Sequence, residues 1–330
     1  MSLADRPDPG REGAPNVSIV VPLYNEQDSV GPLWTALAAV LPRLPGPTEV
    51  ILVDDGSTDA TGAILKRLRA EGAPIRILKL KRNFGQTPAL AAGLDRARGR
   101  IVVTLDGDLQ NDPADIPRLL AEIDRGYDLV CGWRRDRHDP FLTRVLPSRI
   151  ANWLIGRITG VRIHDYGCTL KAFRSEVVRH LNLYADQHRF IPAIAAGHGA
   201  RVSEIPVRHH PRRFGASKYG IGRTLRVLFD LVTLRMCTRF AARPGHWFGV
   251  MSLPFLGLGV LTALATAVNA TKLIRLGDLD FEYAAQTVLP STSFLLFYLA
   301  FHLISLGFLS ELFLKVSDHK MTEILDVAGV

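Results

Sequence analysis

Two long apolar stretches near the end of the chain limit its possible folds more than any other feature. Residues 247–271 contain no charged side chain, and residues 283–310 contain none apart from the titratable His302. A helix of about 20 residues crosses the hydrocarbon core of a bilayer, which is about 30 Å thick. Two buried core helices are the alternative, but such helices are rarely this long and this free of charge. The stretches therefore predict a hairpin of two transmembrane helices.

The charges beside these stretches predict an orientation. Four arginines precede the first stretch, namely Arg226, Arg235, Arg239 and Arg243. Basic residues also follow the second stretch, whereas the loop between the two carries both signs. Positive residues favour the cytoplasmic side. We therefore expect an integral inner (cytoplasmic) membrane protein whose large N-terminal part and C-terminus are both cytoplasmic.

The composition divides the 330 residues into five parts. We expect a disordered tail at 1–15 with no signal peptide, a soluble domain at 16–222 and a cytoplasmic tail at 315–330. A two-helix hairpin occupies 246–314, and an amphipathic helical segment at 223–245 precedes it. That segment fits a helix at the membrane interface, although an amphipathic helix packed on the soluble domain fits almost equally well.

The net charge of +8 favours anionic partners such as phosphates and acidic lipids. Nucleic acid fits poorly, because the basic residues are not interleaved with aromatic residues and no recognition motif accompanies them.

The soluble part alternates short runs rich in β-branched residues with helical segments. The runs lie at 17–21, 49–53, 75–80, 101–105 and 127–131, and the helical segments at 30–41, 60–70, 86–97 and 113–125. This alternation predicts an α/β fold with a doubly wound, mostly parallel sheet. Ligands of such sheets bind at the carboxyl ends of the strands. Three acidic clusters are expected at that edge: Glu26, Asp54 with Asp55, and Asp106 with Asp108.

Asp106 and Asp108 directly follow the fourth apolar run. Two carboxylates one residue apart at a strand end can hold one Mg²⁺ or Mn²⁺ ion. A D-x-D triplet by itself is weak evidence, because it is often only a solvated turn. Its place after a buried strand makes the metal site the better interpretation.

Three motifs occur in a recognisable order: PLYNE at 22–26, DDGSTD at 54–59 and DGDLQ at 106–110. Together they resemble the family 2 glycosyltransferases, which have the Rossmann-like GT-A fold. The RNFGQ stretch at 82–86 resembles their polyprenyl-phosphate branch, which includes the dolichol-phosphate mannosyltransferases and the GtrB enzymes. Later motifs most resemble the undecaprenyl-phosphate 4-deoxy-4-formamido-L-arabinose transferases (the ArnC group), and they lie at 165–168, 190–192, 204–206 and 214–219.

The resemblance implies roles for individual residues. The nucleotide-sugar would be bound by Pro22, Tyr24, Glu26, Asp55, Asn83, Gln86 and Asp106. The metal, Mg²⁺ or Mn²⁺, would be held by Asp106 and Asp108, with Gln110 completing the coordination. Gly107 stands where Ala is common in the branch, and we expect this difference to be harmless because the middle side chain points away from the ion.

The acceptor side needs cations more than a base, because a lipid phosphate is already an anionic nucleophile at neutral pH. The candidates for binding this phosphate are Arg134, Arg144, Ser148, Ser217 and Lys218. Asp165 matches an acidic residue of the family and joins Asp106 and Asp108 as a candidate catalytic residue. For Asp165 we favour a role in positioning the sugar over a role as base.

The implied activity is an inverting transfer of sugar from a UDP- or GDP-linked donor to undecaprenyl or dolichyl phosphate, for cell-envelope glycan or lipid modification. The resemblance also implies a homo-oligomer, a tetramer. One alternative is a processive polysaccharide synthase, but we find no Gln-x-x-Arg-Trp segment of that class in the chain. A non-catalytic membrane scaffold is the other, and the intact Asp106 and Asp108 argue against it. The motifs nominate formamido-arabinose without fixing the sugar, since single hydrogen bonds set that choice.

Overall fold

A computed structural model describes residues 14–135, 146–179, 181, 187–211, 244–270 and 281–316. The chain forms two compact units that divide between Leu234 and Arg235. Most of the predicted tail at 1–15 and of the predicted amphipathic segment at 223–245 lies outside the described residues.

The first unit contains a mixed sheet of seven strands in the order β3-β2-β1-β4-β6-β5-β7. The strands are β1 (Val17–Leu23), β2 (Thr48–Asp54), β3 (Ile75–Lys79), β4 (Ile101–Thr104), β5 (Leu129–Trp133), β6 (Lys171–Arg174) and β7 (Val202–Pro206). Strands β3, β2, β1 and β4 pair in parallel, β6 is antiparallel to β4 and β5, and β7 is parallel to β5. The predicted α/β class with a mostly parallel sheet is confirmed, and the ends of β1, β2 and β4 meet at one edge.

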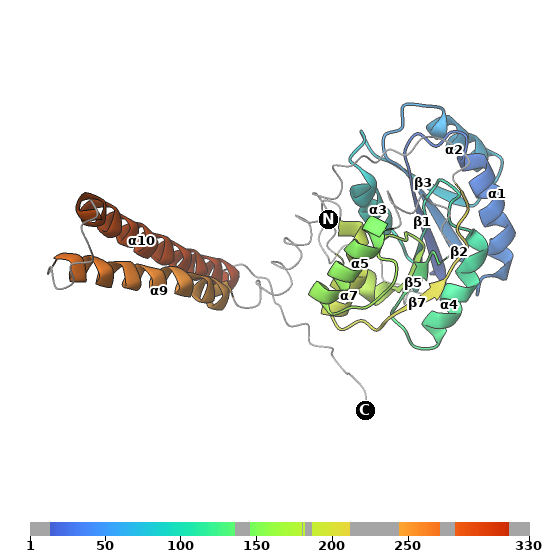
Figure 1. The fold of residues 1–330 in the computed structure, drawn as a ribbon. Helices are drawn as coiled ribbons and strands as arrows, with labels where there is room; N and C mark the ends of the chain where they lie inside the picture. Colours follow the sequence, from blue (N-terminus) through green and yellow to red (C-terminus); the bar gives the residue numbers. More distant parts are fainter. Residues whose placement is uncertain are drawn as a thin grey trace. The chain divides into compact units, whose positions relative to one another are not determined.

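Helices cover both faces of this sheet (Figure 1). They are α1 (Val30–Val40), α2 (Thr61–Ala70), α3 (Gln86–Leu94), α4 (Ile116–Asp124), α5 (Leu146–Thr159), α6 (Ser175–Arg179) and α7 (Ile191–Gly197). Successive residues of a strand point to opposite faces. Ile19 and Val21 accordingly belong to one apolar cluster, and Val20 belongs to the other.

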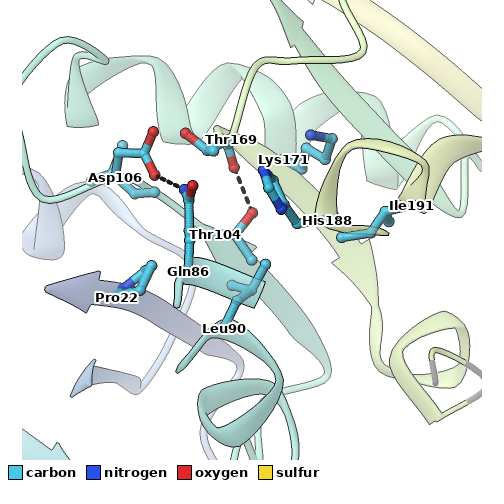
Figure 2. Close-up of a pocket in the computed structure, with 10 residues that line it drawn as sticks. Pro22, Gln86, Leu90, Thr104, Asp106, Thr169, Lys171, His188 and Ile191 are labelled. Carbon is cyan, nitrogen blue, oxygen red and sulfur yellow. Dashed lines mark hydrogen bonds between the residues drawn. The ribbon is translucent and has the colours of Figure 1, made fainter. Parts of the chain in front are cut away.

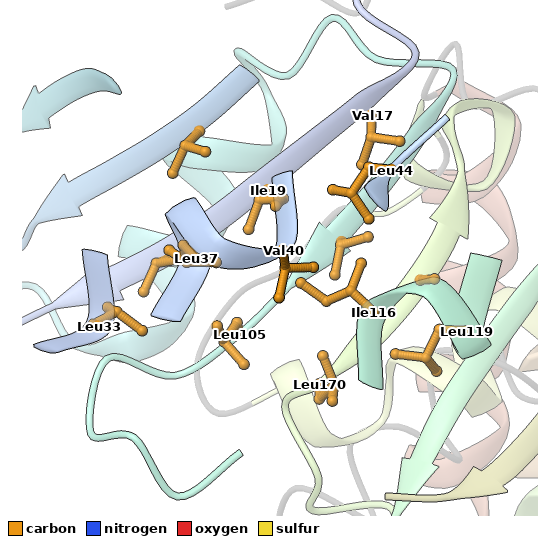
Figure 3. Packing of buried hydrophobic residues seen from close by; sticks show 14 of the residues in the cluster. Val17, Ile19, Leu33, Leu37, Val40, Leu44, Leu105, Ile116, Leu119 and Leu170 are labelled. Carbon is orange, nitrogen blue, oxygen red and sulfur yellow. The ribbon is translucent and has the colours of Figure 1, made fainter. Parts of the chain in front are cut away.

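The first cluster lies where α1 and α4 cover the sheet (Figure 3). Leu33 and Leu37 of α1 and Ile116 and Leu119 of α4 all belong to this cluster, and their side chains are at most 1% exposed. Because both faces of β1 and β2 are covered, these strands appear in the sequence as continuous apolar runs. The rigid core fixes the positions of the loops that follow the strands.

The second unit is a pair of long apolar helices, α9 (Pro244–Ala270) and α10 (Phe281–Val316). Both are long and apolar enough to cross a membrane, and their most apolar windows are only 11% and 17% buried in the chain itself. They pack closely where the Ser293 hydroxyl donates to the carbonyl of Gly259, at 3.0 Å. A Cβ on Gly259 would lie 3.3 Å from Phe297, so a small residue suits this contact. The two helices expected from the sequence are therefore present.

Candidate active site

The loop after β2 is tied to the loop after β3 through Asp55. Its two carboxylate oxygens accept hydrogen bonds from the amides of Phe84 and Gly85, both at 2.8 Å. Burial raises the pKa of Asp55, although these two amides act against the increase. Gly56 has a φ of +65°, and a Cβ there would lie 2.3 Å from the carbonyl carbon of Arg82. The motif at 54–59 thus holds the loop that leads to Gln86.

Gln86, the first residue of α3, reaches the metal motif. Its Nε2 donates to Oδ1 of Asp106 at 2.8 Å. The Asp108 carboxylate accepts from the backbone N–H of Gln110 at 3.1 Å, and Asp108 is 8% exposed. Leu109 between them has a φ of +61°, which is unusual for a side chain with a Cβ and is typical of strained turns at functional sites. The turn after β4 therefore orients both aspartates.

The electrostatics of Asp106 suit a cation. Burial raises the pKa of Asp106 to about 6, and the negative charge of Asp108 adds to this effect. Among the described residues, no group of three or more His, Cys, Asp or Glu side chains could hold a metal. Magnesium is commonly bound by one or two carboxylates together with substrate phosphates. The paired aspartates fit such an ion.

Gly107 is packed against the core. A Cβ at this position would lie 2.3 Å from Cδ2 of Leu23, which is 1% exposed. Glycine therefore fits this position without strain, whereas an Ala side chain would require the buried Leu23 side chain to move.

A small pocket of about 10 Å³ lies beside Asp106, and it has room for about one water molecule. Figure 2 shows Gln86, Thr169, Lys171 and His188 around it. Thr87 holds the His188 ring through a contact of 2.8 Å to Nδ1, and burial lowers the pKa of His188 to about 3 with help from the charges of Arg189 and Lys171. Lys171 is 2% exposed and donates to the carbonyl of Cys168.

Sequence reasoning missed Lys171 and His188. Lys171 lies on β6, which was not predicted, and His188 lies in a single 3₁₀ turn, Gln187–Arg189. Neither residue belongs to a spacing pattern, so the tertiary fold alone brings them to Asp106.

Arg134 and Asp165 form a bidentate ion pair. The guanidinium donates from Nε to Oδ2 at 2.7 Å and from Nη2 to Oδ1 at 3.0 Å. The side chains are 14% and 3% exposed. Arg134 is also close enough to lower the pKa of Asp106, although burial outweighs it. Both oxygens of Asp165 are therefore engaged, which suits positioning better than proton transfer.

This ion pair forms part of the wall of a groove of about 1140 Å³. Its walls include Arg134, Arg135, Ser148, Arg149 and Asp165. The structure thus brings Arg134 and Ser148 of the predicted acceptor set to one groove. Arg144, Ser217 and Lys218 of that set lie outside the described residues.

The remaining nucleotide candidates lie around the same edge of the sheet. Pro22 lines the small pocket with Gln86 and Asp106. The Glu26 carboxylate accepts from the Ser29 hydroxyl at 2.6 Å. Tyr24 is half-buried and Asn83 is exposed. The backbone of Gln110 is fixed by Asp108 and by the N–H of His210, which donates to the Gln110 carbonyl at 2.8 Å.

Comparison with known proteins identifies the family of the chain. The model of the glycosyl transferase family 2 matches residues 18–181. The chain is 51% identical over 252 residues to a dodecaprenyl-phosphate galacturonate synthase of Rhizobium johnstonii, covering 75% of this chain and 74% of the relative. It is 36% identical over 296 residues to an undecaprenyl-phosphate 4-deoxy-4-formamido-L-arabinose transferase of Edwardsiella ictaluri, covering 89% of this chain and 87% of the relative.

Among solved structures, the fold resembles glucosyl-3-phosphoglycerate synthase from Mycobacterium tuberculosis in complex with Mn²⁺, UDP and its product, with a TM-score of 0.52 and 20% identity. The match covers 71% of this chain and 84% of that one, and it supports the GT-A fold. By its sequence relatives, its fold and its ordered motifs, the chain belongs to glycosyl transferase family 2, within the branch that transfers sugars to polyprenyl phosphates.

Proposed function

We propose that this chain transfers a hexuronic acid from a nucleotide-linked donor to a polyprenyl phosphate, with inversion and with a divalent cation at Asp106 and Asp108. The observation that carries the choice of sugar is the similarity to a galacturonate synthase at 51% identity, against 36–41% for the formamido-arabinose transferases. The formamido-arabinose donor, which the motifs nominate, is thus the second candidate.

In the proposed transfer, the protein mainly has to position the lipid phosphate, the sugar and the diphosphate relative to one another. An oxygen of the lipid phosphate forms a bond to the anomeric carbon while the bond from that carbon to the diphosphate breaks on the opposite face. The bound cation would neutralise charge on the leaving diphosphate. Gln86 orients Asp106, and Asp108 is held by the Gln110 amide. Arg134, held by Asp165, lines the groove and supplies positive charge that also acts on Asp106.

A donor screen tests the choice of sugar. The purified full-length chain is mixed with undecaprenyl phosphate and one of four donors: UDP-galacturonate, UDP-galactose, UDP-glucose or UDP-4-deoxy-4-formamido-L-arabinose. We expect lipid product mainly from UDP-galacturonate, read by mass spectrometry. Product mainly from the formamido-arabinose donor would replace our first candidate with the second.

We also propose that the catalytic unit and the C-terminus are cytoplasmic and that the chain assembles as a homo-oligomer, a tetramer as the family resemblance implies. The flanking arginines and the polarity of nucleotide-sugars, which do not cross a bilayer, support the orientation.

Labelling of single cysteines from outside intact cells tests this orientation. A cysteine introduced at Asp280, in the loop between the helices, should react with an impermeant maleimide, and cysteines at Ser2 and Lys320 should not. Labelling at either terminus would contradict the arrangement.

A further inference from the structure

One histidine on the wall of the acceptor groove is held in a single orientation from two sides. The Nδ1 atom of His164 lies 2.5 Å from Oε1 of Glu204, and the His164 backbone N–H donates to Oε2 of the same carboxylate at 2.8 Å. The imidazole also stacks on Trp133, with ring centroids 4.3 Å apart and an angle of 18° between the planes. Together these contacts favour one orientation of the ring, with Nδ1 toward Glu204.

The fold builds this arrangement from two neighbouring strands. Trp133 ends β5, and Glu204 lies on β7 opposite Cys131 of β5. Residues two apart on a strand share a face, so Trp133 and Glu204 project on the same side of the sheet. His164 comes from the loop that joins α5 to β6, one residue before Asp165. The same short loop therefore positions both His164 and the partner of Arg134.

The exposed part of His164 faces a ligand-sized space. The side chain is 66% exposed, whereas that of Glu204 is only 16% exposed. Among the described residues, Nε2 has no hydrogen-bond partner, and His164, Trp133 and Asp165 all line the groove. A mostly buried carboxylate that orients an exposed imidazole is the arrangement found where histidines bind ligands.

We propose that His164 binds an oxyanion of the substrate through Nε2, which makes it a substrate-binding residue beyond the predicted set. A protonated imidazole donates from Nδ1 to Glu204 and from Nε2 to the oxyanion. Among the residues that the structure describes, the charged groups lining the groove are Asp165, which is already paired, and five arginines, at 134, 135, 149, 157 and 162. The inference rests on the proposed function, under which two oxyanions come to this region: the lipid phosphate and the carboxylate of a hexuronate.

Two substitutions of His164 by amides distinguish oxyanion binding through Nε2 from a purely structural role of the bond to Glu204. In His164→Asn the amide N–H₂ takes the place of Nδ1, so the bond to Glu204 is kept and the Nε2 contact is lost. In His164→Gln the amide reaches the position of Nε2, and the bond to Glu204 is lost instead. His198→Asn, at an exposed histidine directly after α7, serves as the matched control.

The assay measures steady-state transfer by the full-length variants with undecaprenyl phosphate and either UDP-galacturonate or UDP-galactose. We expect His164→Asn to raise the KM for the lipid phosphate about tenfold with either donor, as the loss of one charged hydrogen bond predicts, with His164→Gln less affected. A rise in KM confined to UDP-galacturonate would assign the oxyanion to the sugar carboxylate.

An unchanged KM in His164→Asn would overturn the inference. If His164→Asn keeps the wild-type KM values while His164→Gln and Glu204→Gln lower the melting temperature, the imidazole only ties the loop to β7. Absence of any transfer by the wild-type chain would contradict the proposed function instead, so the two failures are distinguishable.

Discussion

Asp108→Asn is expected to lower turnover by about two to four orders of magnitude, since charge neutralisation by a bound cation contributes several kcal/mol to such transfers. The substitution keeps the size of the side chain and the oxygen that accepts from the Gln110 amide, so the turn should survive. Asp124→Asn, at an exposed aspartate that ends α4, is the matched control and should retain full activity. Full activity of Asp108→Asn, or of the wild type in excess chelator, would contradict the metal site.

Thermal stability gives a second measurement of the same site. The raised pKa of Asp106 means that the metal-free fold disfavours its ionised form, so this group's contribution to stability is largest at low pH and is lost as the pH rises through about 6. A cation bound to the ionised carboxylates offsets this loss. Mg²⁺ or Mn²⁺ should therefore raise the melting temperature at pH 7.5, less so at pH 5, and not in Asp108→Asn.

Arg134→Ala is expected to raise the KM for the lipid acceptor or to lower kcat by at least about tenfold, while the affinity for UDP stays nearly unchanged. The guanidinium lines the groove that we propose for the lipid phosphate, and its charge acts on Asp106. Its removal also takes the guanidinium away from the nearly buried Asp165 carboxylate, which keeps its hydrogen bonds from the backbone amides of residues 134 and 167. Removing one member of a buried ion pair costs about 3–5 kcal/mol of stability. Arg144→Ala, outside the described residues, is predicted to affect the acceptor in the same way.

A double variant separates the two roles of Arg134. Arg134→Ala with Asp165→Asn removes both charges, so the stability lost in the single variant should largely return. If Arg134 acts on the lipid phosphate, transfer stays low in the double variant even when its melting temperature recovers. Recovery of transfer together with stability would reduce Arg134 to a structural partner of Asp165, and loss of UDP affinity by calorimetry would assign it to the donor side.

The sequence predicted the parts of the fold in which local pattern and tertiary environment agree. Strands β1, β2 and β4 are covered on both faces and therefore appear as apolar runs, and each of them leads into an acidic motif. Strand β6 begins with a lysine and ends with an arginine over only four residues, so it has no such pattern. Without β6, its antiparallel pairing with β4 and the position of Lys171 beside Asp106 could not be predicted.

In the site, too, residues in local motifs could be predicted, whereas contacts between distant segments could not. Asp106, Asp108 and Gln86 could be named in advance because they occur in ordered motifs. The bond between Gln86 and Asp106 joins residues 20 positions apart, and the bond between Arg134 and Asp165 joins residues 31 apart. Trp133, His164 and Glu204 come from two strands and a loop, and no spacing in the sequence predicted their contact. Such contacts follow from the register of β5 with β7 and from the loop before β6.

The most direct test of the transfer to lipid is the mass of the lipid product. The purified full-length chain is incubated with undecaprenyl phosphate, UDP-galacturonate and Mg²⁺ or Mn²⁺, and the lipid fraction is analysed by mass spectrometry. We predict one new species, undecaprenyl phosphate carrying a single hexuronic acid, which is absent when excess chelator is present. A ladder of products with several sugars, or free sugar released without any lipid product, would contradict the transfer of one sugar to a polyprenyl phosphate.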